Sequence, residues 1–132
     1  MKFKKTLKRV GTLVLVVGLM GTTAFAATHK YNFGLLTTEC KFTSLCEKTN
    51  TSSTAYVTRQ TPDSPITTIL VTVWNSGAAI KSNSKTITGV GTARPSYSGY
   101  NVDKGDYLRL RVCNPSGPNQ GKHISAGGTW EP

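Results

Sequence analysis

Apolar and polar residues alternate along much of the chain, a pattern typical of β-strands in which every second side chain faces a core. The clearest alternation covers residues 106–113. One side of this predicted strand carries the apolar residues Leu108, Leu110 and Val112. The other side carries Tyr107, Arg109 and Arg111, which we therefore expect on the solvent-facing side of a sheet.

A second strong strand pattern runs from Ile66 to Trp74. Its near-continuous apolar character indicates burial on both sides over part of its length. Weaker strand patterns cover residues 31–36, 54–58, 85–90 and 123–130. Within the last of them, Gly127 and Gly128 indicate a bulge or a bend. Convincing helical periodicity is missing from the sequence, although residues 39–49 could form one short helical turn.

Strands of this kind, separated by turn sequences rich in Pro, Gly, Asn and Asp, predict an all-β fold. We expect a small antiparallel β-sandwich. Its core should contain the inward apolar residues of the strongest strands together with one aromatic residue: Phe33, Ile69, Val71, Val73, Leu108, Leu110 and Val112.

The N-terminus follows a different pattern. Five positive charges within the first nine residues precede an apolar run of 11 residues that begins at Val10, and small residues stand at Ala24 and Ala26. This order is typical of a secretory signal peptide. The alternative is an uncleaved membrane anchor, but the run is short against the roughly 20 residues that a membrane span needs. We therefore expect a signal peptide at residues 1–26 and a single secreted, extracellular domain at residues 27–132.

The charge of the predicted secreted domain is moderately basic. The whole chain has a formal net charge of +10, and removal of the signal peptide leaves 11 Lys and Arg residues against 6 Asp and Glu residues, a charge of +5. Such a balance favours anionic partners, for example a cell-wall polymer or a membrane surface. Export makes nucleic acid a poor candidate. The alternative is that the charge serves solubility and has no specific partner.

Three cysteines remain in the predicted domain, and an oxidising environment would permit one disulfide and leave one thiol. We favour a bridge between Cys46 and Cys113, because Cys113 ends a predicted strand and Cys46 precedes another. A bridge between Cys40 and Cys46 is the alternative, since the sequence does not define the geometry that decides between them.

The sequence contains no pattern of catalytic, metal-ligating or cofactor-binding residues that we would defend. His29 and His123 stand apart from any nucleophile motif, and neither a nucleophile elbow nor a phosphate-binding glycine loop is present. Asp103 and Asp106 could contribute to a calcium site, but two acids in a turn are too few for the six or more oxygens of such a site. We therefore expect no enzyme, no cofactor and no metal.

A candidate binding face follows from the alternation described above. The outward residues Tyr107, Arg109 and Arg111 share one strand face, and Arg94, Tyr97 and Tyr100 come shortly before them. If the two segments are adjacent, their side chains form a basic, aromatic surface suited to a sugar phosphate, an anionic polymer or a lipid headgroup. The alternative is an ordinary solvent face, on which Arg and Tyr are common.

Four short motifs resemble those of a group of small secreted proteins of Gram-positive bacteria, the DUF2712 family, which is loosely related to bacteriocin-like peptides of the lactococcin-972 type. The motifs are Tyr31-Asn32-Phe33-Gly34-Leu35, residues 48–53, Tyr107 to Arg111 followed by Asn114, and the ending at residues 124–132. The resemblance implies a bacteriocin-like role. It brings no catalytic residues, and the three cysteines depart from the family pattern.

Three functions remain open from the sequence. The first is a secreted, bacteriocin-like competition factor that binds anionic cell envelopes and is antimicrobial. The second is a cell-wall or surface-binding module without toxic activity. The third, a small secreted hydrolase, is disfavoured because no catalytic pairing is visible. The ligand, the target cell and the oligomeric state are not defined by the sequence.

Overall fold

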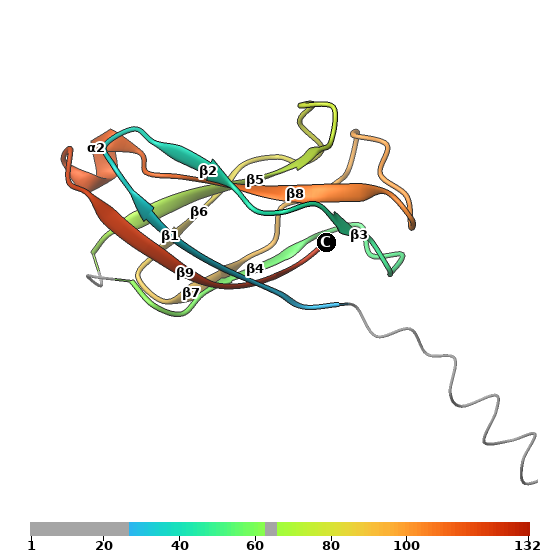
Figure 1. The fold of residues 1–132 in the computed structure, drawn as a ribbon, viewed down its shortest axis with the longest axis horizontal. Helices are drawn as coiled ribbons and strands as arrows, with labels where there is room; N and C mark the ends of the chain where they lie inside the picture. Colours follow the sequence, from blue (N-terminus) through green and yellow to red (C-terminus); the bar gives the residue numbers. More distant parts are fainter. Residues whose placement is uncertain (1–26, 63–65) are drawn as a thin grey trace, which may run out of the picture.

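The structure is a computed structural model that describes residues 27–62 and 66–132. Two antiparallel sheets pack face to face, so the predicted all-β sandwich is confirmed (Figure 1). The predicted signal peptide at residues 1–26 lies outside the described residues. The described part of the chain contains no helix long and apolar enough to cross a membrane.

The first sheet has four strands in the spatial order β1-β9-β4-β7. Their bounds are His29–Leu35 for β1, Ile124–Glu131 for β9, Tyr56–Arg59 for β4 and Gly91–Ala93 for β7. Strand β1 lies at one edge and pairs along its full length with β9, from His29 opposite Trp130 to Leu35 opposite Ile124. The N-terminal and C-terminal strands of the described domain are therefore neighbours in the same sheet.

The second sheet has five strands built around β8. The order β2-β8-β5-β6 comprises Cys40–Phe42, Tyr107–Cys113, Thr68–Asn75 and Lys85–Thr88. The short strand β3, Cys46–Glu47, also pairs with β8, nearer its beginning. A single turn of helix, α2 at Ser116–Asn119, lies in the loop between β8 and β9. Sheet pairing thus places the two most strongly predicted strands, β5 and β8, side by side.

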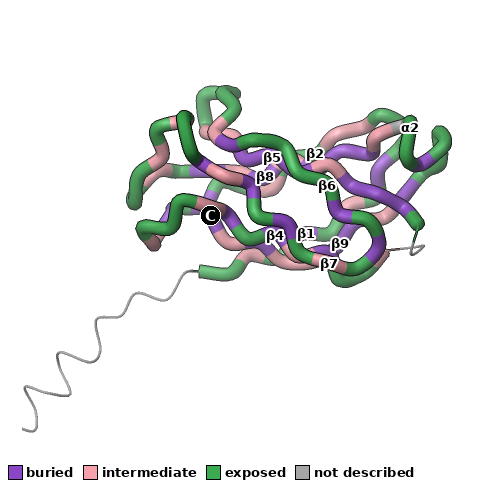
Figure 2. Tube along the Cα trace, turned by 180° about the vertical axis from the view of Figure 1, so that it is seen from behind, coloured by how far each residue is buried: buried purple, intermediate pink, exposed green. Residues whose placement is uncertain are grey.

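The core lies between the two sheets and contains almost all of the residues expected there. Ile69, Val71, Val73, Leu108, Leu110 and Val112 are all buried. Figure 2 shows buried positions recurring along the strands, as the alternation of an antiparallel sandwich requires. Phe33 differs from the expectation, because it is only partly buried and packs against the edge of the core.

Two segments differ from the sequence prediction. Residues 39–49, which by sequence could form one short helical turn, contain the short strands β2 and β3 instead. The strand predicted at residues 85–90 ends earlier, at Thr88, and Gly89 takes a positive φ of 65°. That backbone conformation is accessible to glycine at little cost. The resulting turn carries the chain from β6 in one sheet to β7 in the other.

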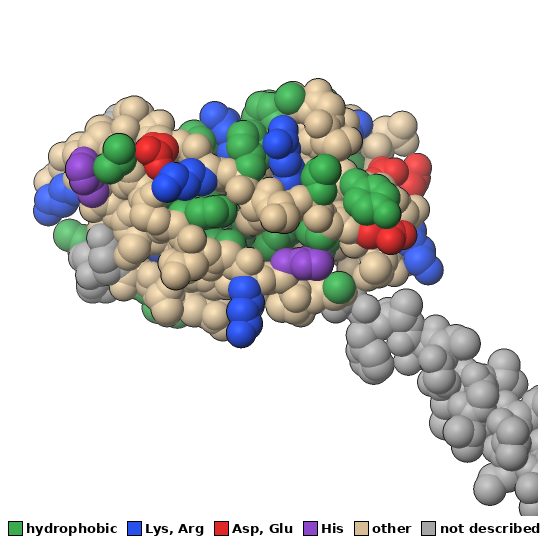
Figure 3. Space-filling model, viewed as in Figure 1, with side chains coloured by type: hydrophobic (Ala, Val, Ile, Leu, Met, Phe, Trp, Pro, Cys, Tyr) green, Lys and Arg blue, Asp and Glu red, His purple; other side chains and the backbone are tan. Residues whose placement is uncertain are grey.

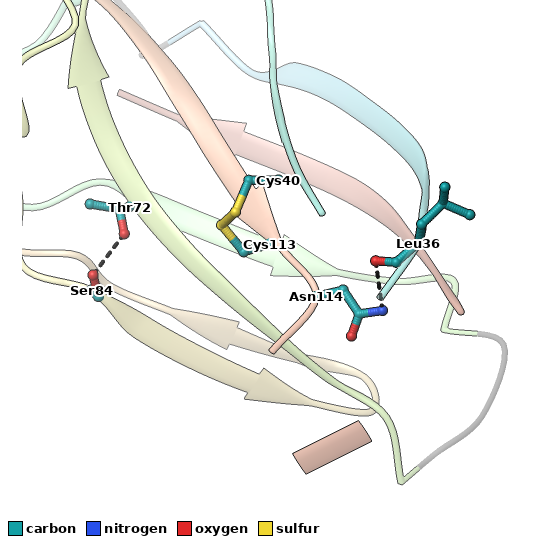
Figure 4. Close-up of a disulfide and its surroundings, with 6 residues drawn as sticks. All are labelled: Leu36, Cys40, Thr72, Ser84, Cys113 and Asn114. Carbon is teal, nitrogen blue, oxygen red and sulfur yellow. Dashed lines mark hydrogen bonds between the residues drawn. A yellow bond between two sulfur atoms is a disulfide. The ribbon is translucent and has the colours of Figure 1, made fainter. Parts of the chain in front are cut away.

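The predicted disulfide between Cys46 and Cys113 is wrong. Cys113 is bonded to Cys40, and the two Cα atoms are 4.0 Å apart (Figure 4). The reason is strand register: Cys40 lies directly opposite Cys113 on β2, whereas Cys46 lies opposite Leu108. Cys46 is a buried free thiol. The bridge joins an edge strand of only three residues to the central strand β8.

The two consecutive glycines of β9 allow close approach between strands. A Cβ atom on Gly128 would stand 1.8 Å from the Thr58 carbonyl oxygen on β4. Tyr31 lies opposite Gly128, and its hydroxyl donates a hydrogen bond to the same Thr58 oxygen across the gap, at 2.9 Å. The N–H groups of Gln60 and Thr61 both donate to the Gly127 carbonyl oxygen, a two-against-one pattern typical of a β-bulge.

Buried polar side chains anchor the loops at one end of the sandwich. Asn114 donates to the carbonyl oxygen of Leu36 at 3.1 Å (Figure 4) and to that of Lys122 at 2.7 Å. Asn119 bonds to the backbone of Thr68 through both its donor and its acceptor, at 2.7 Å in each case. Because each amide serves several backbone groups of different segments, these two asparagines fix the loop after β8 against both sheets.

Candidate functional site

The outer face of the five-stranded sheet carries two arginines stacked on two aromatic rings. Along β8, Leu108, Leu110 and Val112 face the core, so Arg109 and Arg111 point outward. Register places Arg109 opposite Trp74 on β5, and Arg111 opposite Phe42 on β2. We call these four residues, Phe42, Trp74, Arg109 and Arg111, the arginine ladder.

The rings and guanidinium groups of the ladder are in direct contact. The Cζ atom of Arg109 lies 4.1 Å from the Phe42 ring centroid, and that of Arg111 lies 5.1 Å from the Trp74 ring. The two rings meet edge to face, with centroids 5.5 Å apart. Contacts of this type are favourable because the negative face of each ring attracts the cation. Each arginine is therefore held flat against the sheet surface.

In the part of the chain that the structure describes, no acidic side chain forms an ion pair with the arginines of the ladder. Within residues 27–62 and 66–132, the ion pair found is that between Lys41 and Glu39, at 3.2 Å. Neither Arg109 nor Arg111 makes an ion pair in that part of the chain, and the Nε atom of Arg109 is buried without a hydrogen-bond partner there. The outer face thus presents two fixed, uncompensated guanidinium groups.

Only half of the predicted binding face is assembled. Tyr107, with 57% of its surface exposed, shares the outward side of β8 with Arg109 and Arg111, as expected. Arg94 follows β7 in the other sheet, where its Cζ lies 4.3 Å from the ring centroid of Tyr56. The condition for one shared face, adjacency of the two segments, is therefore not met, because β7 and β8 belong to different sheets.

The two tyrosines that follow Arg94 do not contribute to the outer face either. Tyr97 is buried, and its N–H group donates to the Ser53 carbonyl oxygen as the chain crosses the end of the sandwich. Tyr100 is half-buried in a turn, where its N–H donates to Tyr97. Both positions follow from the crossover between sheets, which strand periodicity alone does not reveal.

Hydroxyl groups and the disulfide border the ladder on the same outer face. Thr72 lies opposite Arg111, and its hydroxyl is 2.7 Å from that of Ser84 (Figure 4). Cys113 follows Arg111 by two residues on β8, so the Cys40–Cys113 bridge lies on this side of the sheet and not in the core. The bridge ties β2, and with it Phe42, to the strand that carries both arginines.

A groove opens between the two sheets on the side of β1 and β2. Figure 3 shows hydrophobic side chains gathered along the middle of this face, between the upper and lower layers. The groove has a volume of about 380 Å³, and its walls include His29, Tyr31, Phe33, Phe42, Leu45 and Trp130. It lies at the edges of both sheets, because β1 ends one and β2 with β3 ends the other.

A buried cluster of ionisable groups lies at one end of the sandwich, and one of its members, Lys48, was not singled out as a candidate site residue from the sequence. Lys48 is 1% exposed, its Nζ donates to the Asn50 side chain, and it lies 5.2 Å from the Tyr97 ring centroid. Burial lowers the pKa of Lys48 and raises that of Tyr97. Burial also raises the pKa of the Cys46 thiol to about 11. These shifts keep Cys46 and Tyr97 protonated and unreactive near neutral pH.

The acidic turn considered for calcium has a structural role. The carboxylate of Asp106 accepts a hydrogen bond from the Asp103 N–H group at 2.9 Å, which closes the turn before β8. Among the described residues, no three His, Cys, Asp or Glu side chains gather where a metal ion could be held.

The chain was compared with known proteins at three levels. No family model, no curated protein and no solved structure matches it.

Proposed function

We propose that the protein is a secreted, non-enzymatic factor that binds anionic cell envelopes through the arginine ladder and acts in competition between bacteria. The observation that carries the proposal is the pair of fixed, uncompensated guanidinium groups of Arg109 and Arg111. A guanidinium group binds phosphate or carboxylate oxygens through two parallel N–H donors. Two such groups held on one sheet face suit a polymer that carries repeated negative charges.

The arrangement of the ladder lowers the cost of binding. A free arginine side chain loses conformational entropy when it is immobilised by a ligand. Here the aromatic rings already hold the guanidinium groups against the sheet. The formal charge of +5 for residues 27–132 adds a long-range attraction toward any anionic surface.

Export and the bacteriocin-like role rest on the sequence patterns. The basic and apolar N-terminus is typical of a secreted protein, and the motif resemblance to small secreted proteins of Gram-positive bacteria supports a target in the Gram-positive envelope. A disulfide between Cys40 and Cys113 agrees with an oxidising compartment.

Substitution of both arginines tests the proposal. Glutamine is preferable to alanine, because the arginine side chains lie over Phe42 and Trp74 and truncation to a methyl group would uncover the rings further. We expect Arg109→Gln with Arg111→Gln to weaken sedimentation with Gram-positive envelopes at least about tenfold, equivalent to about 1.4 kcal/mol. The matched control, Lys85→Gln with Lys104→Gln, removes the same charge from exposed positions outside the ladder and should change binding much less.

The outcome also separates two roles of the same face. If the protein is a competition factor, the double arginine variant should lose both envelope binding and growth inhibition of sensitive cells. Envelope binding without any growth inhibition by the unchanged protein would indicate a surface-binding module without toxic activity. Equal loss of binding in the arginine and lysine variants would show that net charge, and not the ladder, is responsible.

A further inference from the structure

The edge strand β2 supplies one of the two rings of the arginine ladder, yet it has little hold on the core. It lies at the edge of its sheet and pairs with β8, and none of its three side chains is buried. By contrast, β3, β5, β6 and β8 of the same sheet each place at least one buried side chain in the core. Hydrophobic burial, the main stabilising contribution in such a fold, therefore does little to attach β2.

The disulfide is the covalent attachment of β2 to the sheet. It joins residues 73 positions apart in the sequence, which limits the arrangements open to a detached β2. The flanking noncovalent ties are a backbone hydrogen bond from Asn114 to Glu39 and two bonds exchanged between Thr43 and Leu110, each 2.9 Å long. Water competes for such bonds at a sheet edge, so their net contribution is modest. We therefore expect the position of β2 to depend on the disulfide.

The contacts of the ladder show what would change if β2 left its place. The Cζ atom of Arg109 lies 4.1 Å from the Phe42 ring centroid, so this cation rests on the ring that β2 carries. The Cζ atom of Arg111 is 5.1 Å from the Trp74 ring and 6.0 Å from that of Phe42. Detachment of β2 would thus free Arg109, leave Arg111 on Trp74, and remove the edge-to-face contact between the two rings.

We propose that the bridge between Cys40 and Cys113 is a redox switch that controls assembly of the arginine ladder. A dithiol reductant cleaves the bridge: its thiolate attacks one sulfur, the S–S bond breaks, and the second thiol of the reductant closes its own disulfide. The protein gains two thiols, and the reductant is oxidised by two electrons. Cys40 is partly exposed and offers the accessible sulfur, whereas Cys113 is buried.

The switch links the ladder to the redox state of the compartment. Thiols stay reduced in a cytosol and form disulfides in an extracellular space, so the ladder is assembled in the second and loose in the first. This regulation rests on the proposed function of the ladder, but assembly itself can be measured without any ligand. Cys46 does not take part, because it lies opposite Leu108 on the core side of the sheet, whereas Cys113 is on the outer side.

The two tryptophans of the chain report on assembly. The full chain is expressed and purified with the bridge closed, dithiothreitol is added without denaturant, and the indole N–H signals are followed by NMR. We expect the Trp74 signal to shift as Phe42 departs, and the signal of Trp130, which is buried in the core, to stay. The Arg109 side-chain signal should become more mobile than that of Arg111. Reoxidation should restore every signal.

An anionic probe measures the consequence for binding. Long-chain inorganic polyphosphate carries repeated negative charges, and its affinity at low salt is measured by calorimetry. We expect reduction to weaken binding about tenfold. Cys40→Ser with Cys113→Ser should bind like the reduced protein under both conditions. Phe42→Leu keeps the bridge but lacks the ring, so its binding should be weak and insensitive to dithiothreitol. Cys46→Ala, the matched control, should respond like the unchanged protein.

Three results would overturn the switch. The first is an unchanged Trp74 signal in protein whose bridge is shown to be open by alkylation and mass spectrometry. The second is a shift of Trp130 as large as that of Trp74, which would mean that the bridge holds the whole sandwich together. The third is full sensitivity of Phe42→Leu binding to dithiothreitol. If the oxidised protein does not bind polyphosphate although the Trp74 signal responds, the proposed function fails and the switch in ladder assembly stands.

Discussion

Two buried tyrosines differ in what their hydroxyl groups meet. The Tyr31 hydroxyl donates to the Thr58 carbonyl oxygen, whereas the Tyr97 hydroxyl has no partner among the described residues. We expect Tyr31→Phe to lower the free energy of unfolding by about 1 kcal/mol, because the Thr58 oxygen loses a hydrogen bond. Tyr97→Phe should be neutral or stabilising. Denaturant unfolding of the two variants checks this, and equal losses would contradict the assigned partners.

The burial of Cys46, Tyr31 and Tyr97 predicts that the folded protein loses stability at alkaline pH. Burial raises the pKa of Cys46 from 9.0 to about 11 and that of Tyr31 from 10.0 to about 12. The folded protein therefore keeps protons that the unfolded chain has already lost, so the free energy of unfolding falls as pH rises from 9 to about 12. Burial of Tyr97 acts in the same direction.

Lys48 opposes this trend over part of the range. Its lowered pKa means that the unfolded chain binds more protons, so its contribution to stability grows as pH rises toward the ordinary value of 10.5 and then stops. We therefore expect the free energy of unfolding to fall most steeply above pH 10.5, where Lys48 no longer offsets the loss. Urea unfolding at a series of pH values measures it, and Cys46→Ala should reduce the fall while removing the free thiol that could exchange with the disulfide. An unchanged stability up to pH 12 would contradict the burial of these groups.

Among the structural elements, the pairing of β9 with β4 depends on a missing side chain. A Cβ atom on Gly128 would overlap the Thr58 carbonyl oxygen, while one on Gly34 would meet nothing within 4 Å. We expect Gly128→Ala to cost about 1–3 kcal/mol of stability, since the two strands must move apart. Gly34→Ala, in the strand on the other side of β9, should change stability by no more than about 0.5 kcal/mol. Thermal unfolding of the two variants checks this. Similar unfolding temperatures would argue against the close approach of Gly128 to the Thr58 carbonyl oxygen.

How much of each element could be predicted depends on its length and regularity. The strands β5 and β8 were predicted with the correct inward residues, because seven or eight residues of alternation define a face. The strands β2 and β3 have three and two residues, which is too short for any period to show. The disulfide was mispredicted for the same reason, since its partner depends on the register of β2.

At the scale of the whole molecule, the outward arginines of β8 were predictable but their surroundings were not. Phe42 and Trp74 reach Arg109 and Arg111 across strands, and cross-strand neighbours follow from register, which the sequence does not state. One signal was available: Trp74 has the same strand parity as Thr72, and so belongs to the outer face of β5. Arg94 lies away from the arginine ladder because the turn at Gly89 carries the chain to the other sheet, a crossover that strand periodicity does not reveal.

The most direct test of the account is the salt dependence of envelope binding. The screening length falls from about 10 Å at 0.1 M salt to about 3 Å at 1 M, so an attachment through Arg109 and Arg111 must weaken across that range. We predict that the purified protein sediments with Gram-positive envelopes at low salt and is released as salt rises, while Arg109→Gln with Arg111→Gln stays largely in the supernatant throughout. Binding that is unaffected by both salt and the double substitution would contradict the proposed role of the arginine ladder.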